Sequence, residues 1–253
     1  MPEAFEIKEN DADRLDPPEV ESEARGPGRP GGEESRARIL EAAGRLFADR
    51  GFDGVSVREL ARAAGVNAAA INYHFGGKEA LYHGVLLKLI EDTEPLFRPI
   101  IERLLAGLAA ADGDPEKLSR VAAALIRDLM RGILGHQSLR WQMPIMLREF
   151  HHPSSEFAML VRDRINPVHD VVSTLIAAAT GYEPRAPQTL LLTANLIAQC
   201  MAFGATKGLI LARLNWEDYT PERINLIIAT MVPRMLAMID LPEADPFAGE
   251  EAV

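Results

Sequence analysis

The stretch over residues 56–78 constrains the fold most, because it predicts two short helices joined by a tight turn. Ser56 and Glu59 have the spacing of a capping box, in which each side chain satisfies the other residue's backbone N–H at a helix start. Gly65 is best suited to the positive φ that ends such a helix, and Asn67 can cap the next one. The stretch is therefore expected to form a helix of about two turns, a turn and a second short helix.

A third helix is expected immediately before this pair, because two helices of this length cannot bury a core by themselves. One helical stripe in that segment is apolar and ends at Arg50-Gly51; its residues are Ile39, Leu40, Ala43, Leu46 and Phe47. Three small helices with a glycine in the last turn describe a helix-turn-helix, whose second helix, here residues 68–75, enters the DNA major groove.

That second helix carries groups suited to reading DNA. Alanines at 68–70 leave its leading end almost bare, so the backbone can approach the groove and the methyl groups can meet thymine. Asn72 is suited to bidentate pairing with adenine. Donors suited to phosphate oxygens are carried by Tyr73, His74, Lys78 and Ser56. The alternative is that Tyr73 and Phe75 are core aromatics, which we favour for Phe75, and that His74 is a structural or surface histidine.

These residues resemble the DNA-binding domain of the TetR family of transcriptional regulators over roughly residues 35–82. The matching motifs are Phe47 with Gly51-Phe52, Ser-Val-Arg-Glu-Leu-Ala from Ser56, Ala64-Gly65-Val66, Ile71 to Phe75, and Lys78 to Tyr82. The resemblance implies DNA contacts at Ser56, Asn67, Ala68, Ala69, Asn72, Tyr73, His74 and Lys78. Many members have Lys, Gly and Tyr at positions 68, 69 and 72, which affects the expected base preference and not the expectation of DNA binding.

The formal net charge of −10 looks unsuited to a DNA-binding protein until it is divided along the chain. Residues 35–82 hold seven Lys or Arg against five Asp or Glu, a net charge of +2, whereas residues 1–34 and 83–253 are net acidic. A protein that compacts DNA regardless of sequence is an alternative. Overall acidity and a recognition helix with few cations make it the weaker one.

Composition also indicates where in the cell the protein is expected to act. Cys200 is the only cysteine, so no disulfide can form within the chain, and a buried thiol in a reducing cytoplasm is expected. The amino terminus is acidic and shows no signal peptide. The most apolar stretch, residues 190–211, is interrupted by Asn195, Gln199 and Lys207, which argues against membrane insertion.

The domain plan expected from these patterns has four parts. Residues 1–32 form a disordered acidic tail in which Arg25 and Arg29 either enter a neighbouring minor groove or stay solvated, as we favour. Residues 33–82 form the helix-turn-helix domain, residues 83–241 a helical regulatory and dimerisation domain, and residues 242–253 a disordered tail. Further helices make the protein all-α; they are expected over residues 78–92, 95–111, 115–134, 137–150, 154–180, 187–214 and 221–241.

The last two long helices carry broad apolar stripes that can face a second copy of the chain. The stripes contain Leu191, Ala194, Ile197, Ala198, Met201, Ala202, Ala205 and Leu209, then Ile224, Ile227, Ile228, Met231, Met235 and Met238. A purely internal core is the alternative. Dimerisation would present two heads about 34–36 Å apart to successive major grooves of a palindromic operator in double-stranded DNA.

A second resemblance concerns the carboxy-terminal part. Pro167-Val168-His169, residues 175–181 and the stretch from Phe203 to Leu211 resemble the regulatory domain of the CecR-like branch of the same family. This implies a homodimeric, ligand-responsive repressor or dual regulator, without identifying the small-molecule effector.

Helical bundles commonly hold small molecules between apolar helices with a few polar groups. The predicted lining residues are Trp141, Met143, Met146, Phe150, Met159, His169, Asn195, Gln199 and Phe203. A ligand that prefers one separation of the two heads would shift the protein towards it, with the helix from residue 78 to 92 as the lever.

An enzyme is the main rival class. His169-Asp170 with Ser173, or His151-His152 near Glu149, could be imagined as acid–base or metal groups. Their spacing matches no metal site, and His151-His152-Pro153 reads as a loop that ends a helix. We therefore expect no catalytic residues, no metal and no cofactor.

Overall fold

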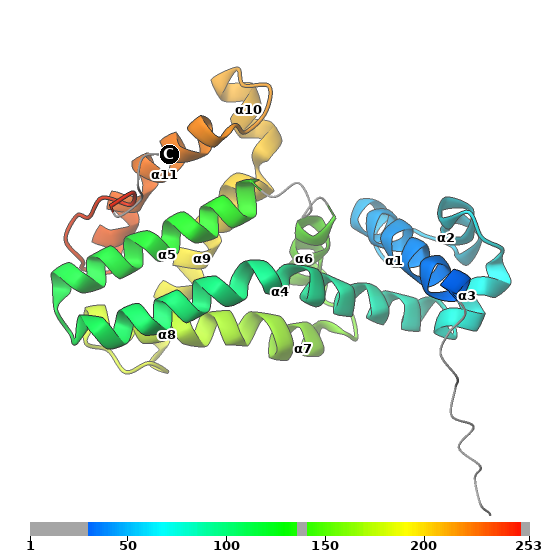
Figure 1. Ribbon diagram of the computed structural model, residues 1–253, viewed down its shortest axis with the longest axis horizontal. Helices are drawn as coiled ribbons and strands as arrows, with labels where there is room; N and C mark the ends of the chain where they lie inside the picture. Colours follow the sequence, from blue (N-terminus) through cyan, green and yellow to red (C-terminus); the bar gives the residue numbers. More distant parts are fainter. Residues whose placement is uncertain (1–29, 136–140, 249–253) are drawn as a thin grey trace, which may run out of the picture.

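The computed structural model describes residues 30–135 and 141–248, and in this part of the chain all regular structure is helical (Figure 1). The expectation of an all-α fold is confirmed. The helices are α1 (Pro30–Arg50), α2 (Val57–Ala64), α3 (Ala68–Phe75), α4 (Lys78–Ala111), α5 (Pro115–Gly135), α6 (Gln142–His151), α7 (Phe157–Leu160), the π-helical turn η2 (Val161–Ile165), α8 (Asn166–Thr180), α9 (Pro187–Ala205), α10 (Lys207–Leu214) and α11 (Pro221–Met238).

The helix-turn-helix forms as its caps predict. The Ser56 N–H donates to Glu59 Oε2 at 2.9 Å, and the Glu59 N–H donates to Ser56 Oγ at 3.3 Å, which completes the capping box. Gly65 ends α2 with φ +65°, a conformation that costs other residues about 1 kcal/mol or more. Asn67 Oδ1 accepts from the Ala70 N–H at 2.8 Å and starts α3.

The first three helices and the start of α4 share one core, which we call the head. Phe47 and Ile71 are fully buried there, and the Phe47 ring meets the Tyr82 ring edge to face at 5.0 Å between centroids. Residues from α6 and α7 join the same core, with Trp141 3% and Leu160 0% exposed. The head is therefore completed by residues distant in sequence.

The remaining helices form the body, in which α5 packs against α4, α9 and α11. The head lies at one end of the molecule, and α4 runs without interruption from the head into the body (Figure 1). The body core contains Ile126, Met130, Leu175, Cys200 and Ile228, all buried. This confirms the expected burial of Cys200.

The expected break between residues 92 and 95 is wrong, because α4 passes through Pro95 and Pro99. Each proline removes one backbone donor, but buried residues on both sides keep the helix in register, from Leu89 at 0% to Ile100 at 5% exposure. A continuous α4 therefore connects the head to the body.

Two expected long helices are in fact divided. The span over residues 187–214 breaks at Thr206, whose hydroxyl donates to the Ala202 carbonyl at 2.7 Å, while the Tyr219 hydroxyl donates to the Phe203 carbonyl at 2.9 Å. The Ala202 carbonyl also keeps its backbone bond from the Thr206 N–H at 2.8 Å, so α9 is regular up to that point. The Phe203 carbonyl, which a continuous helix would pair with the next backbone N–H, accepts from Tyr219 instead. The span over residues 154–180 begins only at Phe157 and contains η2 immediately before Asn166-Pro167.

The ends also differ from expectation. Helix α1 begins at Pro30, inside the segment expected to be a disordered tail, whereas Arg25 and Arg29 lie outside the described residues. Residues 242–248, expected to be disordered, pack against α5. Ser119 donates to the Pro242 carbonyl, and Arg127 Nη1 donates to the Pro246 carbonyl at 2.7 Å.

Candidate nucleic-acid interface

Helix α3 is anchored on one side and open on the other. Ile71 is fully buried in the head, and Phe75 packs against the same core, as expected for a core aromatic. Asn72 is exposed, and Tyr73 is 85% exposed, so Tyr73 is not a core aromatic. Ala68 and Ala69 are also exposed, which leaves the leading end of α3 free of bulky side chains, as a backbone approach to a DNA groove requires.

Several polar groups around α3 already make hydrogen bonds or ring contacts with other residues of the head. Ser56 Oγ donates to Glu59 Oε2 at 2.8 Å, and the Ser56 and Arg50 hydrogen bonds lower the pKa of the Glu59 carboxyl. Asn67 uses its oxygen as a cap and keeps its Nδ2 group for donation. The Lys78 ammonium lies 4.3 Å from the centroid of the Phe52 ring, and the His74 ring lies 5.1 Å from that of Tyr73. These contacts restrict where each side chain can meet DNA.

Exposed arginines not singled out from the sequence also lie on the head. Arg58 and Arg62 are four residues apart on α2, and Arg36 of α1 lies 5.2 Å from the centroid of the Phe75 ring. The four-residue spacing of Arg58 and Arg62 could have identified them from the sequence, because residues four apart lie on the same face of a helix. They add exposed cations to the head, and Arg36 lies directly against α3.

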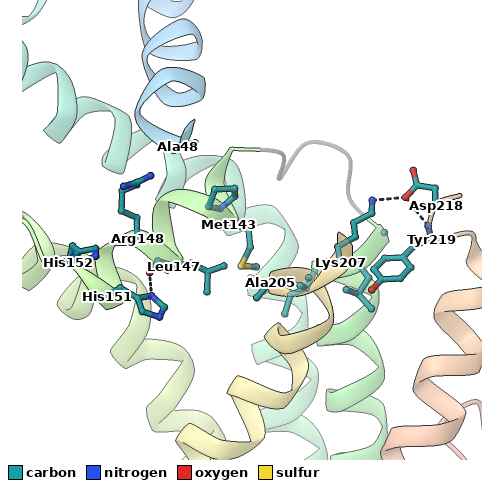
Figure 2. A pocket seen from close by; sticks show the side chains of 15 residues that line it. Ala48, Met143, Leu147, Arg148, His151, His152, Ala205, Lys207, Asp218 and Tyr219 are labelled. Carbon is teal, nitrogen blue, oxygen red and sulfur yellow. Dashed lines mark hydrogen bonds and ion pairs between the residues drawn. The ribbon is translucent and has the colours of Figure 1, made fainter. Parts of the chain in front are cut away.

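A groove of about 790 Å³ lies where α6 meets the end of α1 and the helices α5, α9 and α10. Figure 2 shows Arg148, His151 and His152 at one end, and Lys207, Asp218 and Tyr219 at the other, with Met143, Leu147 and Ala205 between them. The volume of this groove lies in the range typical of small-molecule sites, as does that of a second hollow of about 650 Å³ between Phe52, Tyr82 and Pro153.

Two family models match the chain. The model for bacterial regulatory proteins of the tetR family matches residues 39–85, and the model for the C-terminal domain of the HTH-type transcriptional dual regulator CecR matches residues 118–240. Together they cover the head and most of the body. The chain belongs to the TetR family of transcriptional regulators. Both resemblances inferred from the sequence are confirmed.

Individual relatives agree with the TetR-family assignment. The chain is 28% identical over 200 residues to CecR of Shigella flexneri, across 79% of this chain and 89% of that protein. It is 50% identical over 48 residues to the repressor AcnR of Corynebacterium glutamicum, across 19% of this chain and 26% of that protein. The first match spans head and body, and the second has the length of the head alone.

Solved structures show the same fold. AibR, in complex with isovaleryl coenzyme A and operator DNA, is 19% identical with a TM-score of 0.54, covering 79% of this chain and 97% of that chain. A tetR-family regulatory protein from Rhodococcus RHA1 is 19% identical with a TM-score of 0.55, covering 83% and 99%. At this identity the likeness concerns the fold.

In this TetR-family chain, the residues predicted to line a ligand pocket do not surround one cavity. Trp141, Met146 and Met159 belong to the head core, and Phe150 is 40% exposed. His169 is half-buried on α8, and burial lowers its pKa. Phe203 packs on the body core.

The remaining predicted pocket residues are also separated from one another. The Gln199 side chain donates to Asn195 Oδ1 at 2.5 Å, and Asn195 is exposed on α9. Of the nine residues, Met143 alone lines the α6 groove. Periodicity identified apolar faces but could not say which of them pack against the head.

The groups imagined for catalysis make structural contacts. Ser173 Oγ shares a hydrogen bond with Thr193 Oγ1 at 2.9 Å, and both residues are buried. Glu149 is 1% exposed and accepts from the Tyr82 hydroxyl at 2.5 Å. His151 donates from Nδ1 to the Leu147 carbonyl at 2.7 Å. Within the described residues, no cluster of three or more His, Cys, Asp or Glu is arranged to hold a metal.

Proposed function

We propose that the protein is a homodimeric, ligand-responsive repressor that binds a palindromic operator in double-stranded DNA through α3. The observation that carries this proposal is the division of α3 between buried Ile71 and exposed Asn72 and Tyr73. A helix anchored in this way holds its outer side chains at a fixed angle to the groove, as base reading requires. The eight residues predicted from the sequence to touch DNA remain our proposed contacts.

The proposed domain boundaries follow the packing. Residues 33–82 supply most of the head and residues 83–241 most of the body, although α4 crosses the boundary and α6 and α7 pack on the head. The protein is proposed to act in the cytoplasm, consistent with a single buried cysteine.

Dimerisation is proposed to use the outer face of α9. Leu191 is 70% exposed, and Ala194, Ala198 and Ala202 continue the exposed row at helical spacing. In the described part of the chain, α9 is the one helix apolar and long enough to suit a membrane span, yet an exposed row of small residues equally suits a close contact with a second helix.

The contribution of α11 to the proposed dimer interface is smaller than the sequence suggested. Its stripe is mostly used inside the chain, because Ile227, Ile228 and Met235 are buried in the body core. Leu226 is 57% exposed and remains available to a partner. The proposed interface therefore consists mainly of α9, with the exposed side of α11 beside it.

Selection of bound fragments from a random DNA pool tests DNA reading directly. The protein should prefer the selected palindrome over random DNA by at least about a thousandfold. Asn72→Ala should relax base choice at one position and cost about 1–3 kcal/mol, whereas Lys78→Ala should weaken binding to all sequences alike and lower the salt slope by about one. Equal effects of the two variants on selected and random DNA would contradict the assigned roles.

A further inference from the structure

The α6 groove has a position that suits control of the head. Ala48 of α1 lines it together with α6 residues, while Gly204 and Ala205 come from α9 of the body. A molecule bound there would touch the head and the body at once. Its volume of about 790 Å³ is large enough for a small organic molecule.

The charges that line the groove are unbalanced. Lys207 Nζ pairs with Asp218 Oδ1 at 2.5 Å, so these two opposite charges satisfy each other. Arg148 has no carboxylate partner among the side chains that line the groove. Its Nη2 donates to the Asp49 carbonyl at a long 3.3 Å, and its buried Nε has no hydrogen-bond partner in the described structure. A guanidinium offers five N–H donors, so Arg148 retains unused capacity for an anion.

The neighbouring histidine adds a second donor or acceptor. His151 uses Nδ1 towards the Leu147 carbonyl, which leaves Nε2 to face a ligand. Next to this polar end, Figure 2 shows Leu147 and Met143 forming an apolar stretch that continues to Ala205. The groove thus places a cation beside an apolar surface.

We propose that this groove is the effector site and that its ligand is an amphipathic organic anion, with its acidic group on Arg148 and its apolar body along Leu147 and Met143. This inference rests on the proposed ligand response. Arg148 also contacts the end of α1, because its Nη2 donates to the Asp49 carbonyl and its guanidinium lies close to Gly51, where an added Cβ would be only 2.8 Å from Nη1. An anion that draws the guanidinium towards the groove removes this contact, and the head loses one of its supports on α6.

Two fluorescent probes with the same aromatic skeleton, one anionic and one uncharged, separate a requirement for charge from non-specific apolar binding. The anion is 8-anilinonaphthalene-1-sulfonate, and the uncharged match is N-phenyl-1-naphthylamine, which lacks the sulfonate. The full-length protein should bind the anion saturably at one site per chain. Arg148→Gln should weaken the anion about tenfold, the loss of one charge-assisted hydrogen bond, and leave the neutral probe unchanged.

Matched variants locate the site. Arg185→Gln removes an exposed arginine outside the groove and should bind both probes as the unchanged protein does. Leu147→Glu places a carboxylate in the apolar stretch and should abolish anion binding, whereas anion bound to the exposed face of α9 would be retained. Arg148→Lys, which keeps the charge, should retain most of the affinity if Arg148→Gln fails to fold.

Anion affinity that is unaffected by both Arg148→Gln and Leu147→Glu would overturn the assignment, as would equal losses in Arg148→Gln and Arg185→Gln. The probe measurement needs no DNA. The ligand proposal can therefore fail while operator binding is observed, and operator binding can fail while the probe binds in the groove. In the second arm, the anionic probe at saturation should change the affinity of the unchanged protein for the selected DNA but not that of Arg148→Gln. No change in the unchanged protein would refute the link from groove to head.

Discussion

Gly44→Ala tests the contact between α6 and the head. Gly44 lies on α1, and a Cβ built there would be 2.8 Å from Cδ2 and Cε2 of Trp141 and 2.9 Å from Cε3. Carbon atoms in contact normally lie about 3.5–4.0 Å apart, so the indole ring or α1 must move. Trp141 is 3% exposed and its Nε1 donates to Glu41 Oε2 at 3.2 Å, which leaves little freedom.

The expected magnitude is the balance of three effects. Replacing glycine by alanine inside a helix stabilises it by about 1 kcal/mol. Overpacking a buried site costs about 1–3 kcal/mol. Displacing the indole also weakens its hydrogen bond to Glu41, which contributes about 1 kcal/mol. Gly44→Ala should therefore lower the free energy of unfolding by about 1–3 kcal/mol.

Gly32→Ala is the matched control on the same helix, because nothing lies within 4 Å of the Cβ it would add. It should leave the free energy of unfolding unchanged or raise it by up to about 1 kcal/mol. Urea unfolding measures both, and Gly44→Ala in a Trp141→Phe background should lose most of its cost because the smaller ring leaves room. If Gly44→Ala stabilised the protein as Gly32→Ala does, α6 would not pack on α1 in solution.

Three further predictions concern the body. Leu191→Glu, which puts a charge on the exposed α9 face, should raise the dimer dissociation constant at least about tenfold by analytical ultracentrifugation, whereas Leu105→Glu, at a similarly exposed site on α4, should not. Burial lowers the pKa of His169, so the unfolded chain takes up the proton first as pH falls. The free energy of unfolding should be at its full value above the usual histidine pKa of about 6.5 and decline towards pH 5, and His169→Gln should decline less. Burial raises the pKa of Cys200 to about 12, so iodoacetamide at pH 8 should label the urea-unfolded chain and not the native protein.

The helix-turn-helix could be read from the sequence because its signals are local. The capping box at Ser56, the positive φ of Gly65 and the cap at Asn67 each depend on groups within a few residues of one another. Local hydrogen bonds of this kind need no tertiary information. The same holds for the exposed side of α3, since the burial of Ile71 fixes by periodicity where Asn72 and Tyr73 point.

The body was predicted less accurately because long-range packing decided its helix ends. Pro95 and Pro99 are breakers by local rules, yet buried neighbours hold α4 straight through them. Thr206 is not a breaker by local rules, yet α9 ends there where Tyr219 takes the Phe203 carbonyl.

The sequence by itself determined the helix-turn-helix of the head, the all-α class and the burial of Cys200. The tertiary structure decided which apolar faces meet: Trp141 packs on α1 and not in a pocket, and Arg148 stands beside a groove that periodicity does not reveal. The physical reason is that burial favours any apolar face roughly in proportion to its area, without direction. Which partner covers that face depends on shape and on hydrogen bonds between residues far apart in the chain.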